Sequence, residues 1–70
     1  MIRNNLARLL SERRMSIAEL ARQADLAYSV VHPIAKGRAQ RYDVDTLDAI
    51  CSALGCAVGD ILEHVPGGHA

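Results

Sequence analysis

The chain has few aromatic side chains: of its 70 residues none is Trp or Phe, and two are Tyr. The core must therefore be built from Leu, Ile, Val and Ala, as the cores of small helical bundles are. A chain of this length forms one domain and buries a core of limited size. Such a domain has little stability to spare, so a partner subunit would stabilise it further.

Cysteine is also scarce, since Cys51 and Cys56 are the two thiols of the chain. Neither they nor the three histidines have the spacing of metal ligands, so we expect no metal and no cofactor. Buried free thiols suit a reducing environment, and we expect a cytoplasmic protein. The N-terminal segment has no long apolar run, so we expect neither a signal peptide nor a membrane span. No Ser/His/Asp arrangement or phosphate-binding loop is visible, and we expect no enzyme.

The net charge is zero, but the charges are unevenly distributed along the chain. All eight Lys and Arg residues lie before Tyr42, and with three acidic residues they give residues 1–41 a net charge of +5. Residues 42–70 contain five acidic residues and no Lys or Arg. A chain with this distribution can present a positive face to phosphates and a negative face away from them.

Residues 16–37 carry the pattern that is most informative about function. Ser16 and Glu19 form an S-x-x-E capping box, which predicts the start of a helix over residues 17–24. The apolar residues of this helix have the spacing of a single helical face: Ile17, Leu20, Ala21 and Ala24. A short connection through Asp25 and Leu26 leads to a second predicted helix over residues 28–35, which Gly37 ends. Two short helices joined so closely cross steeply and form a helix-turn-helix, whose second helix can enter a DNA groove.

Three further helices are predicted from apolar spacing. They cover residues 3–13, with Asn4 or Asn5 near the start, residues 46–54, with Asp45 or Thr46 as the cap, and a short stretch over residues 58–62. No strand-like alternation of useful length is present, so the predicted fold is all-α with five helices. We expect one domain over residues 1–65 and a flexible tail over residues 66–70. The predicted core consists of Leu6, Leu10, Leu20, Ala21, Leu26, Val31, Ile34, Leu47, Ile50, Leu54 and Ile61.

Three segments resemble one family: NNLARLLSERRMSIAELA, the V-V-H-x-I-x-x-G spacing that follows, and RYDVDTLDAICSALGCAVGDIL. Through them, residues 2–64 are similar to the phage repressor/Cro-type helix-turn-helix family, also called the xenobiotic-response-element type. The resemblance implies a five-helix, repressor-like DNA-binding domain. It also implies a transcriptional regulator that is usually a homodimer.

The resemblance can be carried over residue by residue. It implies that the second helix of the motif faces DNA bases with Tyr28, Ser29 and His32. Two of these have an alternative reading, since the Tyr28 ring could pack on the preceding helix and His32 could be exposed without a role. The implied phosphate contacts are Lys36, Arg38 and Arg41, with Arg22 and Arg13 as flanking contacts. Arg22 and Arg13 could instead pair with Glu19 and Glu12.

The second helix and the turn before it depart from the family pattern at three positions. Asp25 stands where a turn glycine is common, which is a small change because Asp tolerates the left-handed conformation. Ala27 stands where Ser or Thr normally caps the helix, which removes a cap worth about 1 kcal/mol. Pro33 lacks an N–H and crowds the carbonyl of Ser29, so we expect the helix to be bent or cut short there. Proline also cannot offer a polar side chain to a base.

Two functions follow from these observations. The leading hypothesis is a repressor that binds double-stranded DNA as a homodimer on an inverted-repeat operator. Its dimer surface would be the acidic half of the chain or the apolar end formed by Val58, Ile61, Leu62 and Val65. The alternative is a protein-interaction or antitoxin-like assembly module that retains the fold with weak or lost base reading. Salt-sensitive binding to mixed-sequence DNA would distinguish the two.

Overall fold

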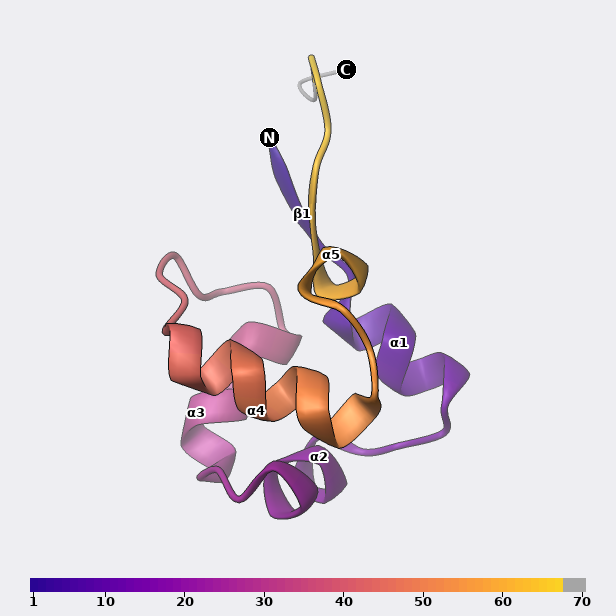
Figure 1. Cartoon of the computed structure of the whole chain (residues 1–70), viewed down its shortest axis with the longest axis vertical. Helices are drawn as coiled ribbons and strands as arrows, with labels where there is room; N and C mark the ends of the chain where they lie inside the picture. The colour runs from indigo at the N-terminus through magenta and orange to yellow at the C-terminus, as the bar shows by residue number, and fades with distance from the viewer. Residues whose placement is uncertain (68–70) are drawn as a thin grey trace.

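The structure, a computed structural model, describes residues 1–67, which form five helices and a two-stranded sheet (Figure 1). In chain order the elements are β1 (Ile2–Asn4), α1 (Leu6–Glu12), α2 (Ile17–Ala24), α3 (Tyr28–Ala35), α4 (Val44–Leu54), α5 (Val58–Ile61) and β2 (Leu62–His64). The helices pack around one core, and the two strands rise from it side by side with the N-terminus at their free end (Figure 1). Pro66 and Gly67 lie in a turn, and residues 68–70 of the expected tail lie outside the described residues.

The helix-turn-helix has the predicted bounds, whereas the predicted starts of α1 and α4 are wrong. Residues 2–4 belong to a strand, so α1 begins only at Leu6, where the side-chain oxygen of Asn4 accepts from the Leu6 N–H at 2.9 Å. The cap of α4 is Asp43, whose carboxylate accepts from the Thr46 N–H at 3.1 Å. This bond has the N-cap to N3 geometry that satisfies a free amide at a helix start. The fold is thus mostly helical and keeps its helix-turn-helix.

A small antiparallel sheet departs from the all-α prediction, which otherwise holds for the five helices. Strands β1 and β2 pair Ile2 with His64, Arg3 with Glu63 and Asn4 with Leu62. The pairing continues past the strands, since the N–H of Val65 donates to the carbonyl of Met1 at 2.8 Å and the Met1 ammonium donates to the carbonyl of Val65 at 3.0 Å. Each strand has three residues, too few to show a period of two in the sequence. We call these paired ends, residues 1–5 and 61–65, the terminal ribbon.

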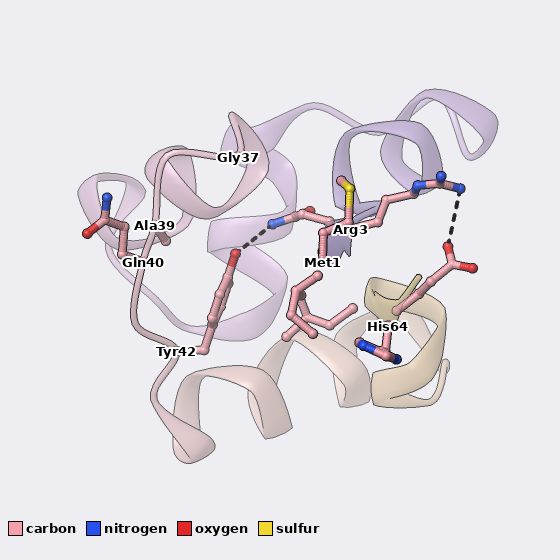
Figure 2. A pocket seen from close by; sticks show the side chains of 11 residues that line it. Met1, Arg3, Gly37, Ala39, Gln40, Tyr42 and His64 are labelled. Carbon is pink, nitrogen blue, oxygen red and sulfur yellow. Dashed lines mark hydrogen bonds and ion pairs between the residues drawn. The ribbon is translucent and has the colours of Figure 1, made fainter. Parts of the chain in front are cut away.

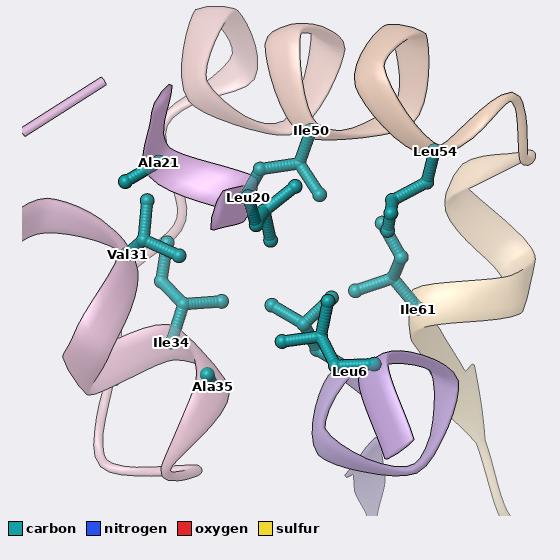
Figure 3. Packing of buried hydrophobic residues seen from close by; sticks show 10 residues of the cluster. Leu6, Leu20, Ala21, Val31, Ile34, Ala35, Ile50, Leu54 and Ile61 are labelled. Atoms are coloured by element: carbon teal, nitrogen blue, oxygen red, sulfur yellow. The ribbon is translucent and has the colours of Figure 1, made fainter. Parts of the chain in front are cut away.

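The core lies between α4 on one side and α1, α3 and α5 on the others (Figure 3). Leu6, Leu20, Val31, Ile50 and Ile61 have no exposed surface. The other buried apolar residues are Leu10, Ala21, Ile34, Ala35 and Leu54. The predicted core is therefore largely confirmed.

Three residues depart from the predicted core. Ala35 is buried although it was not predicted, because it follows Ile34 at the end of α3 and faces inward with it (Figure 3). Leu26 is half-buried and packs against the edge of the core. Leu47 is half-buried on the outer side of α4, where it lines a groove with Val44. The inward face of α4 is therefore narrower than its apolar pattern suggests.

The two thiols are half-buried rather than buried, and both are free. Burial, then the neighbouring Cys56 and the carboxylates of Asp48 and Asp60, raise the pKa of the Cys51 thiol. Within residues 1–67 no helix is both long and apolar enough to cross a membrane. The same residues contain no group of three or more His, Cys, Asp or Glu side chains that could hold a metal ion.

Candidate nucleic-acid interface

The start of α2 is held by the capping box that the sequence predicts. The N–H of Glu19 donates to Ser16 Oγ at 3.0 Å, and the N–H of Ser16 donates to Glu19 Oε1 at 3.4 Å. Both bonds satisfy amides that a helix leaves without partners in its first turn. The direction of α2 is therefore set by local chemistry at its first residue.

The turn between α2 and α3 is closed by a left-handed residue. Asp25 has a φ of 57°, a conformation that Asp tolerates better than most residues do. The N–H of Leu26 then donates to the carbonyl of Ala21 at 2.8 Å, as in a Schellman ending. Half-buried Leu26 packs against the core, which fixes the turn from inside. The crossing of α2 and α3 is thus determined by backbone bonds and one apolar anchor.

The first turn of α3 exposes two of the three side chains that the resemblance assigns to base contacts. Tyr28 is 52% exposed, Ser29 is exposed, and His32 is half-buried. The rings of Tyr28 and His32, one turn apart, have centroids 5.4 Å apart and planes tilted by 36°. Tyr28 is thus largely open to solvent, with its ring beside His32. No side chain caps the start of α3, in agreement with the Ala27 departure.

The helix continues through Pro33 to Ala35, so of the two expectations, that it would be bent or cut short there, the second is wrong. Beyond the proline, the N–H of Lys36 donates to the carbonyl of His32 at 2.9 Å and the N–H of Gly37 to that of Ile34 at 3.1 Å. These bonds, together with the burial of Ile34 and Ala35, hold the last turn of α3 in place. The missing bond to Ser29 remains a local cost of the proline.

The basic residues after α3, and Arg22 on α2, are exposed and form no ion pair within residues 1–67. Among residues 1–67, the pairs within 4.0 Å are Arg3 with Glu63 at 3.7 Å and Arg8 with Glu12 at 3.9 Å. The predicted phosphate contacts have no acidic partner of this kind and are exposed: Arg22, Lys36, Arg38 and Arg41. These four exposed basic side chains can therefore bind a negatively charged ligand.

Arg13 makes a contact that the sequence does not predict. Its guanidinium donates to the carbonyl of Leu54 and so connects the end of α1 to the C-terminus of α4. A cation at the C-terminal carbonyls of a helix satisfies free acceptors and favours the helix dipole. Arg13 thus has a structural contact, and it does not form the ion pair with Glu12 that was its alternative.

Asn4 is a site residue that sequence reasoning missed. Its side-chain amide donates to the carbonyl of Ile34 at 2.9 Å and to the Tyr42 hydroxyl at 3.2 Å. Ile34 lies at the end of α3 and Tyr42 lies just before α4, so one side chain holds both ends of the segment that carries Arg38 and Arg41. No sequence signal distinguishes Asn4 from a helix cap, because its partners are 30 and 38 residues away.

A hollow of about 910 Å³ lies between the terminal ribbon and this segment (Figure 2). Ala39 and Tyr42 line it from one side, and Met1, Ile2 and Leu62 from the other. The hydrogen bond between Tyr42 and Asn4 crosses one end of it, and the ion pair of Arg3 lies at its rim (Figure 2). Ile2 is 61% exposed, so apolar surface continues from the hollow to the outside of the ribbon.

Comparison with known proteins agrees with this geometry. The family profile of the Cro/C1-type HTH DNA-binding domain matches residues 5–67. Over 60 residues the chain is 37% identical to an uncharacterized HTH-type transcriptional regulator, YozG, of Bacillus subtilis strain 168. That match covers 86% of this chain and 71% of the relative.

Proposed function

The chain belongs to the Cro/C1-type helix-turn-helix DNA-binding family, and from that membership we propose that it is a repressor that binds an inverted-repeat operator as a homodimer. One observation carries the proposal. The exposed N-terminal part of α3 is followed directly by three exposed cations without acidic partners, Lys36, Arg38 and Arg41. A reading helix beside free cations is what a protein needs to contact base edges and the adjoining phosphates together.

In this proposal the side chains divide by role. Tyr28, Ser29 and His32 contact base edges in the major groove, where a hydroxyl or imidazole can pair with either kind of base. Lys36, Arg38 and Arg41, with Arg22 beside them, bind phosphates and set the register without reading sequence. Asn4 acts as a positioning residue, because it holds the segment on which Arg38 and Arg41 lie.

The homodimer follows from the small size of the reading surface. One helix of eight residues contacts only a few base pairs, too few to define a site in a genome, and two copies double that number. Ile61 has no exposed surface, so it cannot form the dimer surface as expected. Leu62 and Val65 are half-buried on the terminal ribbon, next to exposed Met1 and Ile2. We assign the dimer surface to this apolar side of the ribbon.

An alternative function is favoured by two specific features of α3. The helix begins without a side-chain cap and contains Pro33, so it lacks both a stabilising group and a polar side chain at that turn. A module that uses this fold to bind a protein, as an antitoxin-like partner would, does not need either. In that case α3 contacts DNA weakly and without sequence preference.

Selection of bound sequences from a random pool of double-stranded DNA tests the proposal. An inverted repeat with two equal half-sites is the expected result, and its binding should weaken steeply with salt. Recovery of no common sequence, with affinity equal for operator-like and mixed DNA, would support the assembly module instead. If the protein binds neither operator-like nor mixed DNA, then neither α3 nor the basic residues contact DNA and the proposal is wrong.

A further inference from the structure

A second apolar surface lies on the outer side of α4, away from the hollow at the ribbon. It is a groove of about 330 Å³ lined by Val44, Leu47, Asp48 and Cys51 from α4 and by Val58 from α5. Val44 is 78% exposed and Val58 is 51% exposed. These are among the most exposed large apolar side chains of residues 1–67, and nothing in the proposed DNA contact uses them. We call this surface the α4–α5 groove.

The spacing of the groove residues indicates what shape could cover them. Val44, Leu47 and Cys51 stand at i, i+3 and i+7 along α4, which places them in one stripe about 10 Å long on the helix surface. The adjoining face of α4, with Ile50 and Leu54, is already packed in the core, and Cys51 lies at the border between the two faces. A stripe of this kind is what a second helix packs against when an amphipathic helix lies in a groove.

The charge around the groove indicates what the partner carries. Asp45, Asp48 and Asp60 are exposed on α4 and α5, and Asp48 lines the groove itself. The sequence has no Lys or Arg from Tyr42 onward, so no basic residue of these elements offsets them. Burial and Cys56, and after them repulsion by Asp48 and Asp60, raise the pKa of the Cys51 thiol in the groove. A partner with Lys or Arg beside its apolar stripe would neutralise this rim.

A second copy of the chain fits the groove poorly. Two copies joined about a two-fold axis through the groove would bring Asp48 of each against like charge, which is destabilising. Joining the groove to the basic residues after α3 would cover the cations that are free for DNA. Such a head-to-tail contact would also build a ring or a filament in place of a two-fold dimer.

We propose that the α4–α5 groove binds a positively charged amphipathic helix of another protein. The basis is the exposed apolar stripe at helical spacing, its acidic rim and the absence of basic residues from α4 and α5. Because these residues are separate from α3 and from the basic segment after it, partner and DNA can be bound together. A regulator with these two separate surfaces can bind a partner protein while it remains on its operator.

Titration of the full chain with synthetic peptides tests the proposal. The probe is an amphipathic helix of about 18 residues made of Leu and Lys, with its Leu residues in one stripe. Two controls are a peptide of the same composition in scrambled order and a helix with Glu in place of Lys. Backbone amide resonances of the isotope-labelled protein report where each peptide binds. We expect saturable binding of the first peptide alone, with shifts confined to residues 43–60.

Matched variants separate the apolar stripe from the charges. Replacing Val44 and Val58 together by Ser should weaken peptide binding at least tenfold, which is about 1.4 kcal/mol. Val30→Ser is the control, because Val30 is 41% exposed on α3, outside the groove. Asp48→Asn keeps the shape and should weaken binding severalfold, and it decides the question if the double variant fails to fold. DNA binding should be unchanged in every groove variant.

Four results would overturn the proposal. Equal binding of the scrambled peptide would mean that its charge alone attracts it. Binding of the acidic helix would show that the partner is not positively charged. Groove resonances that move when the protein alone is diluted would show that a second copy covers the groove. Absence of saturable binding up to about 1 mM peptide would show that this surface takes no such helix. None of these results depends on whether the protein recognises an operator.

Discussion

The side-chain amide of Asn4 lies 2.9 Å from the carbonyl of Ile34, so a residue in the first strand holds the C-terminal turn of the helix assigned to DNA reading. The same amide reaches the Tyr42 hydroxyl at 3.2 Å. The strand thereby supports the last turn of α3. This turn follows Pro33, which cannot form the backbone bond to the Ser29 carbonyl. The helix that we propose to contact DNA is thus supported by a residue near the N-terminus.

Replacing Asn4 by Ala should lower both stability and DNA affinity. The variant removes the donor to the part-buried Tyr42 hydroxyl and one of the two donors to the Ile34 carbonyl, which keeps its bond from the Gly37 N–H. The expected cost is about 1 to 3 kcal/mol in the free energy of unfolding. Tyr42→Phe removes only one of the two bonds and should cost less. Urea melts and DNA titrations of the single and double variants measure the coupling. Additive losses would show that Asn4 and Tyr42 do not act together.

Loss of Lys36, Arg38 or Arg41 should weaken binding to all DNA sequences alike. Each Ala variant removes one phosphate contact, so the slope of log affinity against log salt should fall by about 1. Arg8→Ala is the matched control, because Arg8 pairs with Glu12 on α1. Fluorescence anisotropy at several salt concentrations gives the slopes. A change in sequence preference with an unchanged slope would assign the residue to base reading instead.

Leu20→Ala should destabilise the domain by about 2 to 5 kcal/mol. Leu20 has no exposed surface and sits at the centre of the core between α2 and α4 (Figure 3), so the variant leaves a cavity. Denaturant melts measure the loss, with Ala18→Ser on the exposed face of α2 as the control. A neutral result for Leu20→Ala would contradict the packing described here.

Replacing Pro33 should stabilise α3, and the choice of replacement separates two effects. Pro33→Ala restores the N–H that can donate to Ser29 and should raise the free energy of unfolding by up to about 3 kcal/mol. Pro33→Gln restores the same bond and adds a polar side chain, so it alone should also raise operator affinity over a scrambled sequence. Thermal melting and paired DNA titrations give the comparison. Lower melting temperatures in both variants would show that the proline fits its native site well.

The protein should be a dimer whose operator half-sites lie about one helical turn, or 34 Å, apart. Sedimentation of the chain over a range of concentrations measures the association. Ile2→Lys places a charge on the apolar side of the terminal ribbon, where Ile2 is 61% exposed, and should shift the protein toward monomer. Full affinity of a monomer for a single half-site would refute the symmetric arrangement.

The helix-turn-helix could be predicted because its signals are local. The capping box spans four residues, and Asp25 and Leu26 determine the turn from within it. The strands could not be predicted, because β1 and β2 pair residues from opposite ends of the chain. Arg13 is a similar case, since its partner Leu54 lies 41 residues further along. Propensity and spacing describe a segment, whereas these contacts depend on how the segments pack.

The candidate site follows the same division. The exposure of Tyr28 and Ser29 could be predicted from their place on the outer face of a short helix, and so could the exposure of the basic residues that follow. Asn4 could not be identified as a residue that supports α3, because an Asn just before a predicted helix is interpreted as its N-cap. The outward position of Leu47 was also hidden, since any apolar residue at that spacing suggests a core face.

The pairing of Met1 with Val65 has a consequence for the order of folding. Joining these ends directly in the unfolded chain means closing a loop that contains almost the whole molecule, and its entropic cost precedes any gain from three-residue strands. Once the helices have docked, α1 and α5 already hold the ends near each other and most of that cost has been met. The terminal ribbon should therefore form last and open first, with the packed helices remaining intact. Its amide hydrogens would then exchange with solvent through local opening, well before those of α2 and α4.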